Sequence, residues 1–435
     1  MAELPHRALN WAQDPVLDGL EVYRVGGAIR DERLGLTPNE HDFVVVGADP
    51  DQMLARGFRA VGRDFPVFLH PVHAAEFALA RTERKSAPGY RGFQFHAGPD
   101  VTLEQDLLRR DLTINAIAED RQGQLIDPFR GLRDIDDRTL RHVSPAFSED
   151  PVRLLRLARF ATRFQQFGVA EDTLNLCRDM VAQGEVDALV PERIWQEMQR
   201  ALGHARPDRF FRLLRKTGAL EKILPELDVL FGIPQNPEYH PEVDSGEHVM
   251  QVLNQAARLN VPVATRFACL VHDLGKGLTP EREWPSHRKH EHTGLPLVRA
   301  VSERLRVPKE YQQLALLVCA HHLKVHQALT LRASTVVDLI QALDGWRRPE
   351  RFDQVLLACK ADLLGRSDMP DDESCAAPFD SAALDYLSQA RQRTEQVDVK
   401  AWTTAGIEGK ALADRIRQHR IERVQALKQQ FKPTR

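Results

Sequence analysis

The stretch VYRVGGAIRDERL, residues 22–34, decides how the N-terminal part of this chain folds. Residues 22–25 are typical of a short strand, Gly26-Gly27 of a tight turn, and residues 28–34 of a helix start. Glycine lets the backbone approach a phosphate closely, and the N-terminus of a following helix offers free N–H groups to an anion. Arg30 adds positive charge one turn further on. Alone, the stretch fits a phosphate-binding loop or a mere turn, and its neighbours must decide.

The next segment outward, EHDFVVVG at residues 40–47, places two acidic residues before an apolar run. If Glu40 and Asp42 lie on one strand, their side chains point to the same face. Two like charges side by side repel each other, and a divalent cation between them removes that cost. Mg²⁺ prefers carboxylate and phosphate oxygens. The pair therefore indicates a magnesium site beside the glycine turn, with a solvated strand edge as the alternative.

Strand signals continue through residues 67–69 and 76–80 and mostly stop after Pro145. The first ~140 residues therefore predict a small mixed sheet with helices, and the remainder predicts helices. The fold class expected is α+β. Helices are predicted at 151–164, 171–182, 191–202, 207–217, 246–259, 263–273, 293–305, 309–321, 334–343, 349–364, 380–391 and 408–430.

Composition limits the class of protein. The 435 residues suffice for two to four domains, and 43% hydrophobic with 28% charged residues is an ordinary soluble balance. No run approaches the ~18 apolar residues of a membrane helix, and residues 1–13 lack the apolar core of a secretory signal. Five scattered cysteines without a CxxC pair indicate reduced thiols, so we expect a cytoplasmic protein without membrane attachment. The net charge of −3 leaves room for a local basic face that binds nucleic acid.

The segment RRDLTINA, residues 109–116, joins two arginines to a short, partly apolar stretch. Arg109 and Arg110 suit a triphosphate or ribose, and Asn115 can donate and accept hydrogen bonds. An exposed helix end with surface arginines is the alternative.

The segment EDPVRLLRLARF, residues 149–160, reads as the start of a helix. Asp150, Arg153 and Arg156 are three residues apart and share one helical face, with Arg159 a turn further on. An aspartate and an arginine held together can offer acceptors and donors to the edge of a nucleobase. In isolation, an ion pair on an exposed helix explains the spacing equally well.

A second constellation gathers in the middle of the chain, where nine of the 17 histidines lie between His240 and His326. His272-Asp273 ends an apolar helix and can chelate a metal with ligands from other helices: His248, His322 and Asp362. Imidazole and carboxylate together suit Ni²⁺, Mn²⁺ or Zn²⁺ better than Mg²⁺ alone, and such a site activates water against a phosphate ester. Several neighbours can replace His322 or Asp362 as ligands in a shifted register: His287, His290, His292, His321 and His326.

Taken together, the order of these motifs resembles the class II tRNA nucleotidyltransferases, the CCA-adding enzymes, in their long bacterial form with a C-terminal HD phosphohydrolase domain. The resemblance extends over most of the chain from Tyr23 to about Arg366. It is carried by YRVGGAIRDERLG (23–35), EHDFVVVG (40–47), GRDFPVFLHP (62–71), EFALARTERKS (76–86), RRDLTINA (109–116), DPFRGLRDI (127–135), LRHVSPAFSEDPVRLLRLARF (140–160) and VHDLGKG (271–277).

The resemblance implies a domain plan in which a mixed-sheet nucleotidyltransferase head is followed by an all-helical neck, body and tail. We expect a loosely docked N-terminal extension at 1–20 and the head at 21–143. A helical region that selects the nucleotide and binds RNA would follow at 144–235. The HD domain would span 240–346 and a helical tail 347–435.

The resemblance also implies an activity for the head, the addition of CMP, CMP and AMP from CTP and ATP to the 3′ end of tRNA in maturation and repair. By motif, Glu40 and Asp42 would bind Mg²⁺, and Asp150 and Arg153 would pair with the base as a protein template. The incoming nucleotide would be held by Gly27, Arg30, Arg110, Arg156 and Arg159.

For the HD domain the resemblance implies phosphatase, 2′-nucleotidase and 2′,3′-cyclic phosphodiesterase activities. The expected metal, with Ni²⁺ as a candidate, would be held by His248, His272, Asp273, His322 and Asp362. Lys276 would contact the substrate phosphate. The tRNA would contact the basic run 410–432, for which a solvated helix is an equal alternative. A monomer and a homodimer both fit the sequence.

The sequence departs from the usual family pattern at one position, and three other functions remain possible. The family usually has aspartate where this chain has Glu40, a carboxylate one methylene longer. A bacterial poly(A) polymerase shares the head but carries a more basic stretch than Asp64-Phe65-Pro66 after residues 62–63. A nucleotide-sensing or RNA-binding module with lost catalysis is the second alternative. A protein with only a working HD hydrolase is the third.

Overall fold

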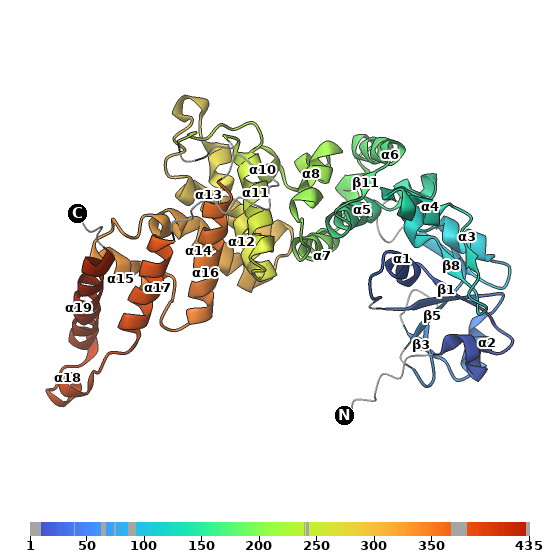
Figure 1. Ribbon diagram of the computed structural model, residues 1–435, viewed down its shortest axis with the longest axis horizontal. Coiled ribbons are helices and arrows are strands. Elements are labelled where there is room, and N and C mark those ends of the chain that lie inside the picture. Colours follow the sequence, from blue (N-terminus) through green and yellow to red (C-terminus); the bar gives the residue numbers. More distant parts are fainter. Residues whose placement is uncertain are drawn as a thin grey trace. The chain divides into compact units, whose positions relative to one another are not determined.

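The computed structural model describes residues 10–38, 40–61, 67–73, 75–85, 93–238, 240, 243–366 and 381–431. The chain divides into two compact units (Figure 1). The first contains residues 1–194 and 216–219, and the second contains residues 195–215 and 220–435. Three parts of the predictions lie outside the described residues. They are residues 1–9 of the N-terminal extension, residues 62–66, which were used to distinguish a poly(A) polymerase from a CCA-adding enzyme, and residue 432 of the basic run.

In the described part of the first unit, the main sheet is seven-stranded and mixed, in the order β3-β4-β5-β2-β1-β8-β9. The β2 and β5 strands run parallel and the other neighbours antiparallel, so the predicted mixed sheet is confirmed. Its strands are β1 (Glu21–Val25), β2 (Asp42–Val46), β3 (Arg59–Val61), β4 (Val67–Leu69), β5 (Glu76–Leu79), β8 (Ala118–Glu119) and β9 (Leu125–Ile126). Separate pairs are formed by β6 (Arg81–Lys85) with β7 (Phe93–Ala97), and by β10 (Thr139–Leu140) with β11 (Gly168–Val169).

The central strand β2 is buried on both faces, which explains its unbroken apolar run. Phe43 and Val45 belong to one core cluster, and Val44 belongs to the cluster on the opposite face. Helices of this unit are α1 (Gly27–Arg33), α2 (Pro50–Ala55), α3 (Leu103–Leu108), α4 (Gly131–Asp136), α5 (Val152–Arg163) and α6 (Glu171–Ala182).

The expectation of a loosely docked N-terminal extension is wrong for residues 10–20. Leu17 is fully buried in the head core, and the Trp11 ring lies 5.4 Å from that of Phe43. Asp14 caps the following turn, and Arg121 donates to the carbonyl oxygens of this segment. The apolar residues at 11, 16, 17 and 20 are too widely spaced to read as an element, yet they cover one face of the sheet.

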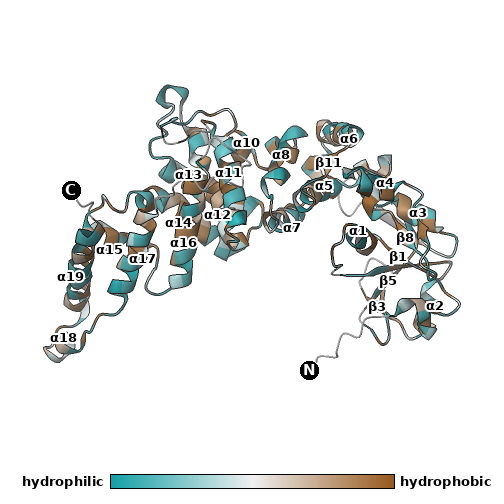
Figure 2. Cartoon of the chain, in the orientation of Figure 1, coloured by the Kyte–Doolittle hydropathy of each residue, from teal (hydrophilic) through white to brown (hydrophobic). Residues whose placement is uncertain are grey.

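The second unit is helical in its described part. Its core helices α11 (Ser245–Arg258), α12 (Val263–Val271), α14 (Lys309–His326) and α16 (Pro349–Leu364) pack against one another. Figure 2 shows hydrophobic and hydrophilic stripes along these helices. The other helices are α8 (Asp208–Lys216), α10 (Pro225–Asp228), α13 (His290–Arg304), α15 (Ala333–Ala342), α17 (Ala382–Glu395), α18 (Lys400–Thr404) and α19 (Gly409–Lys428). Two further helices, α7 (Pro191–Leu202) and α9 (Ala219–Ile223), contain residues of both units, and so does α8 through Lys216. Among the described helices, none has the length and apolar character needed to cross a bilayer.

Candidate functional sites

The acidic edge of the head sheet is formed where three strands meet. Asp42 opens β2, opposite Val25 of β1 and beside Glu76 of β5 in the strand register. Glu40 precedes the strand, so the two predicted carboxylates do not share it, although both are exposed near one edge. Glu76 is an acidic residue that the sequence reasoning missed, because its place beside Asp42 depends on a parallel pairing between segments 34 residues apart. Oxygen ligands of this kind suit a hard divalent cation.

The glycine turn lies next to this edge, since β1 ends at Val25 and Gly26 follows directly. Gly26 has φ +74° and ψ −123°, a conformation that favours glycine. A Cβ atom on Gly26 would lie 2.8 Å from Nη1 of Arg110. The predicted triphosphate residue Arg110 therefore lies against the predicted glycine loop. Its guanidinium donates to the Asn115 carbonyl oxygen at 3.3 Å and to Asp106 at 3.2 Å, while its buried Nε has no acceptor among the described residues.

Arg30, also predicted to hold the nucleotide, is only 3% exposed. It forms an ion pair with Asp31 and donates to the Asn115 side chain. Its guanidinium carbon lies 5.3 Å from the centre of the Phe160 ring and 5.0 Å from that of Phe164. These contacts connect α5 to α1, the helix that follows the glycine turn. Direct contact between Arg30 and a nucleotide stays a prediction.

The predicted base-selecting face spans the start of α5. Asp150 precedes the helix and accepts the N–H of Val152 at 3.0 Å. Arg153 is buried, donates to the Ala146 carbonyl at 2.9 Å, and faces Glu83 at 3.6 Å. Both side chains thus have partners within the protein, and these contacts do not show whether either side chain reaches a base. The pairing of Asp150 and Arg153 with a base stays a prediction.

Arg156 and Arg159, a turn apart on α5, both approach the Phe160 ring, at 5.8 and 4.4 Å. The Arg156 guanidinium is 2.7 Å from Asp111. Burial alone would raise the pKa of Asp111, but Arg156 and hydrogen bonds from Asn115 and the backbone hold that pKa far below its usual range. Asp111 is thus a fixed anion that orients Arg156.

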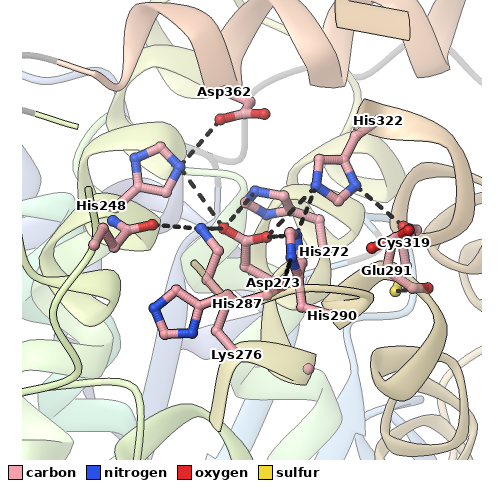
Figure 3. Close-up of polar contacts among 12 residues, drawn as sticks. His248, His272, Asp273, Lys276, His287, His290, Glu291, Cys319, His322 and Asp362 are labelled. Atoms are coloured by element: carbon pink, nitrogen blue, oxygen red, sulfur yellow. Dashed lines mark hydrogen bonds and ion pairs between the residues drawn. The ribbon is translucent and has the colours of Figure 1, made fainter. Parts of the chain in front are cut away.

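In the second unit the structure brings all five predicted HD-site residues together (Figure 3). They come from α11, the end of α12, α14 and α16, and none is more than 3% exposed: His248, His272, Asp273, His322 and Asp362. His248 Nε2 is 3.0 Å from Asp362, and His322 Nε2 is 3.6 Å from Asp273.

Two further histidines belong to this cluster, and both were left open by the sequence. His290 Nε2 lies 3.2 Å from Asp273, and His326 Nε2 lies 2.6 Å from Asp362. Helix α14 runs to residue 326 rather than 321, which places His322 and His326 one turn apart on it. Their contacts depend on how α13, α14 and α16 pack, which spacing alone could not decide.

The ring orientations in this cluster fit a bound metal. The Nδ1 atoms of His272, His290 and His322 each lie 2.7–3.1 Å from a backbone carbonyl, which can only accept. A neutral ring in this position holds its proton on Nδ1, which leaves Nε2 available to a cation. The Nε2 atoms of His290 and His322 are 3.2 Å apart. Two lone pairs at that distance repel each other, and a cation between them turns the repulsion into ligation.

The local charge of the cluster also suits cations. Burial works against ionisation of Asp273, yet His272 and Lys276 hold its pKa well below the usual range. Lys276 Nζ lies 2.6 Å from Asp273 and also donates to Gln235. Asp362 has a similarly lowered pKa, despite burial, because of Arg366 and His326. Residues 272, 322 and 362 sit in or just after the last turns of their helices, where the helix dipole is negative.

The basic run at 410–432 is engaged within the second unit. Arg420 donates to the Thr394 carbonyl oxygen, and Arg423 donates to the carbonyl oxygens of Arg393 and Gln396. Arg417 forms an ion pair with Asp338. Arg420 and Arg423 cap the end of α17 and Arg417 contacts α15, so the predicted tRNA contact gains no support from the described part of the run.

Three regions of the chain match models of known protein families. The Poly A polymerase head domain model matches residues 22–141, the model of a probable RNA and SrmB-binding site of polymerase A matches 166–231, and the HD domain model matches 246–365. The multifunctional CCA protein of Alkalilimnicola ehrlichii is 54% identical over 414 residues, 95% of this chain and 98% of that relative. The chain belongs to the multifunctional CCA protein family.

Further comparisons agree with this family. The multifunctional CCA protein of Thioalkalivibrio sulfidiphilus is also 54% identical, over 95% of this chain and all of that relative. A solved CCA-adding enzyme in an apo form matches 96% of this chain and 91% of its own, with a TM-score of 0.66 and 20% identity. A Thermotoga maritima CCA-adding enzyme complexed with tRNA matches 97% and 93%, with a TM-score of 0.63 and 19% identity. These structures confirm the α+β fold expected from the sequence.

Proposed function

We propose that this chain adds CMP, CMP and AMP from CTP and ATP to the 3′ end of tRNA. The observation that carries the proposal is the position of Asp42 opposite the last residue of β1, with Glu76 of β5 on its other side, next to the glycine turn that Arg110 contacts. Membership of the multifunctional CCA protein family over 95% of the chain supports it.

The residues of the head divide the work by their chemistry. Glu40, Asp42 and Glu76 would hold Mg²⁺, which when bound polarises the 3′-hydroxyl and neutralises the pyrophosphate leaving group. The glycine turn and Arg110 bind the triphosphate, because backbone N–H groups and a guanidinium are natural phosphate donors. Asp150 and Arg153 read the base, since a wrong base leaves their polar groups unpaired. Glu40 remains an oxygen ligand, so activity survives the departure from aspartate.

The test is incubation with CTP, ATP and a tRNA trimmed of its last three nucleotides. The proposal requires restored CCA ends, with two cytidines incorporated for each adenosine. Long oligo(A) products without cytidine would identify a poly(A) polymerase. No incorporation at all would identify a binding module or a chain in which only the hydrolase works.

We further propose that the HD domain is a phosphohydrolase that binds two divalent cations. His248, His272 and Asp362 form one group of ligand atoms within 4.8 Å, and Asp273, His290 and His322 form another. Both groups are buried, and a bound cation supplies an activated water against a phosphate ester. Lys276 orients Asp273 and faces the same centre, where it can neutralise a substrate phosphate. The substrates implied are phosphate monoesters, 2′-nucleotides and 2′,3′-cyclic phosphates, and Ni²⁺ is the candidate ion.

Metal content tests this second proposal independently of catalysis. The parent, loaded with Ni²⁺ and desalted, should hold two ions per chain, and His290→Ala should hold one. His292→Ala is the matched control, because His292 is on the same helix but exposed and outside both groups. Equal nickel content in the parent and His290→Ala would contradict the second cation position.

The proposal places the protein in the cytoplasm with tRNA, CTP and ATP as partners. The choice between monomer and homodimer stays a prediction.

A further inference from the structure

A buried row of alternating charges runs through the head unit. We call it the arginine–carboxylate chain: Arg110, Asp106, Arg109, Glu83 and Arg153. Its successive contacts are 3.2 Å from Arg110 to Asp106, 2.6 Å to Arg109, 2.8 Å to Glu83 and 3.6 Å to Arg153. The members come from α3 and the residues just after it, β6, and α5. These ion pairs connect elements distant in sequence, together with hydrogen bonds such as the one from Arg109 to the Arg81 carbonyl oxygen.

The members of this row are shielded from solvent, which strengthens the ion pairs between them. The Asp106 side chain is fully buried, and that of Arg153 is 8% exposed. Arg109, Arg110 and Glu83 are between 14% and 17% exposed. Removing one member of a buried pair leaves an uncompensated charge, so each member strongly restricts the position of the next.

The row carries more positive than negative charge. Among its five members, three guanidinium groups face two carboxylates. The buried Nε of Arg110 has no acceptor among the described residues. An excess of cations with an unused donor at one end fits the arrival of an anionic ligand.

The two ends of the row coincide with the two halves of the nucleotide site. Arg110 lies against Gly26, in the loop proposed for the triphosphate. Arg153 is one of the two residues proposed to read the base. The row therefore joins the phosphate end of the site to its base end through Asp106, Arg109 and Glu83.

We propose that Asp106 and Glu83 are positioning residues for nucleotide addition, Asp106 setting Arg110 for the triphosphate and Glu83 setting Arg153 for the base, with Arg109 coupling the two. This inference rests on the proposed CCA-adding function. It predicts separable effects: Asp106 governs affinity for any nucleotide, and Glu83 governs the choice among bases.

The experiment uses the full chain with trimmed tRNA, and measures kcat and KM for CTP, ATP and UTP separately. Asp106→Asn should raise KM for CTP and ATP alike by about tenfold, because it weakens charge-assisted bonds to Arg110. Glu83→Gln should leave KM for CTP within about twofold and lower the preference for CTP over UTP by about tenfold. In the variant that combines Asp106→Asn and Glu83→Gln, the free-energy changes of the two single substitutions should not add up. In a chain that also carries Arg109→Gln, they should add up, because the residue that couples them is gone.

Glu32→Gln is the matched control, because it breaks an ion pair of the same unit, 2.5 Å to Arg24, away from the row. It should change neither KM nor base preference. If Asp106→Asn does not fold, as judged by thermal unfolding, Arg109→Lys is used in its place. We expect Arg109→Lys to change both KM and base preference, each by less than the other substitutions do.

The inference is overturned if folded Asp106→Asn and Glu83→Gln retain parental KM and parental base preference, or if both lose kcat equally without either effect. A parent that adds no nucleotide to trimmed tRNA would instead refute the proposed function, so the two failures are distinguishable.

Discussion

Substituting Gly26 by alanine tests the phosphate-binding loop in two separable ways. Gly26 has φ +74°, where an L-residue is strained by about 1–3 kcal/mol. The new Cβ would also lie 2.8 Å from Nη1 of Arg110 and 3.4 Å from the Asn115 carbonyl oxygen. The guanidinium must move, and a displaced charge-assisted contact to phosphate costs about 1.5–3 kcal/mol. We expect KM for both CTP and ATP to rise about ten- to hundredfold, together with a loss of unfolding free energy.

Gly35→Ala separates the two effects, because Gly35 has φ +71° but no heavy atom within 4 Å of the added Cβ. It should lose about 1 kcal/mol of unfolding free energy and keep the parental KM. Chemical unfolding gives the first quantity and steady-state nucleotide incorporation gives the second. The assignment of the loop is refuted if both variants show the same KM, since the contact with Arg110 would then have no bearing on nucleotide binding.

Three further predictions follow from particular contacts. Arg156→Gln should lower the free energy of unfolding most at neutral pH, because the lowered pKa of Asp111 stabilises the fold above the ordinary carboxyl pKa of about 3.9 and this stabilisation is lost as pH falls toward the folded pKa. Urea unfolding at pH 7 and pH 3 checks it, and a parent–variant gap that widens at pH 3 would contradict it. Leu17→Ala should cost about 2–5 kcal/mol, because Leu17 is fully buried in the head core, and an unchanged midpoint of urea unfolding would show that the N-terminal segment is not part of that core. His272→Ala should abolish hydrolysis of a 2′,3′-cyclic phosphate and spare nucleotide addition, and equal loss of both would argue against separate sites.

Local patterns in the sequence were enough to predict the glycine turn, the buried strand and the helix that carries Asp150 to Arg159. Each depends on neighbours within a few residues, and so does the adjacent pair His272-Asp273. The same reasoning missed Glu76, because a parallel strand register is decided by the packing of the whole sheet. It also placed Glu40 on the strand, which in fact begins at Asp42.

The burial of charged residues was the hardest feature to predict. Arg30 was predicted to hold the nucleotide and Arg153 to pair with its base, yet the rings of Phe160 and Phe164 lie against Arg30, and Glu83 and a backbone carbonyl contact Arg153. His290 joined the metal ligands only because α13 packs beside α14. The contacts of Arg30 with Phe160 and of Arg153 with Glu83 join residues that lie 130 and 70 positions apart in the sequence.

The most direct test of the account is nucleotide addition by Asp42→Ala, measured with trimmed tRNA, CTP, ATP and saturating Mg²⁺. Asp51→Ala serves as the control, because Asp51 is an exposed carboxylate of the same unit on α2, away from the acidic edge. The account predicts that Asp42→Ala loses CMP incorporation by at least about a thousandfold, with an unchanged unfolding midpoint, while Asp51→Ala matches the parent. Incorporation by Asp42→Ala at the parental rate would contradict the assignment of this edge as the centre of catalysis.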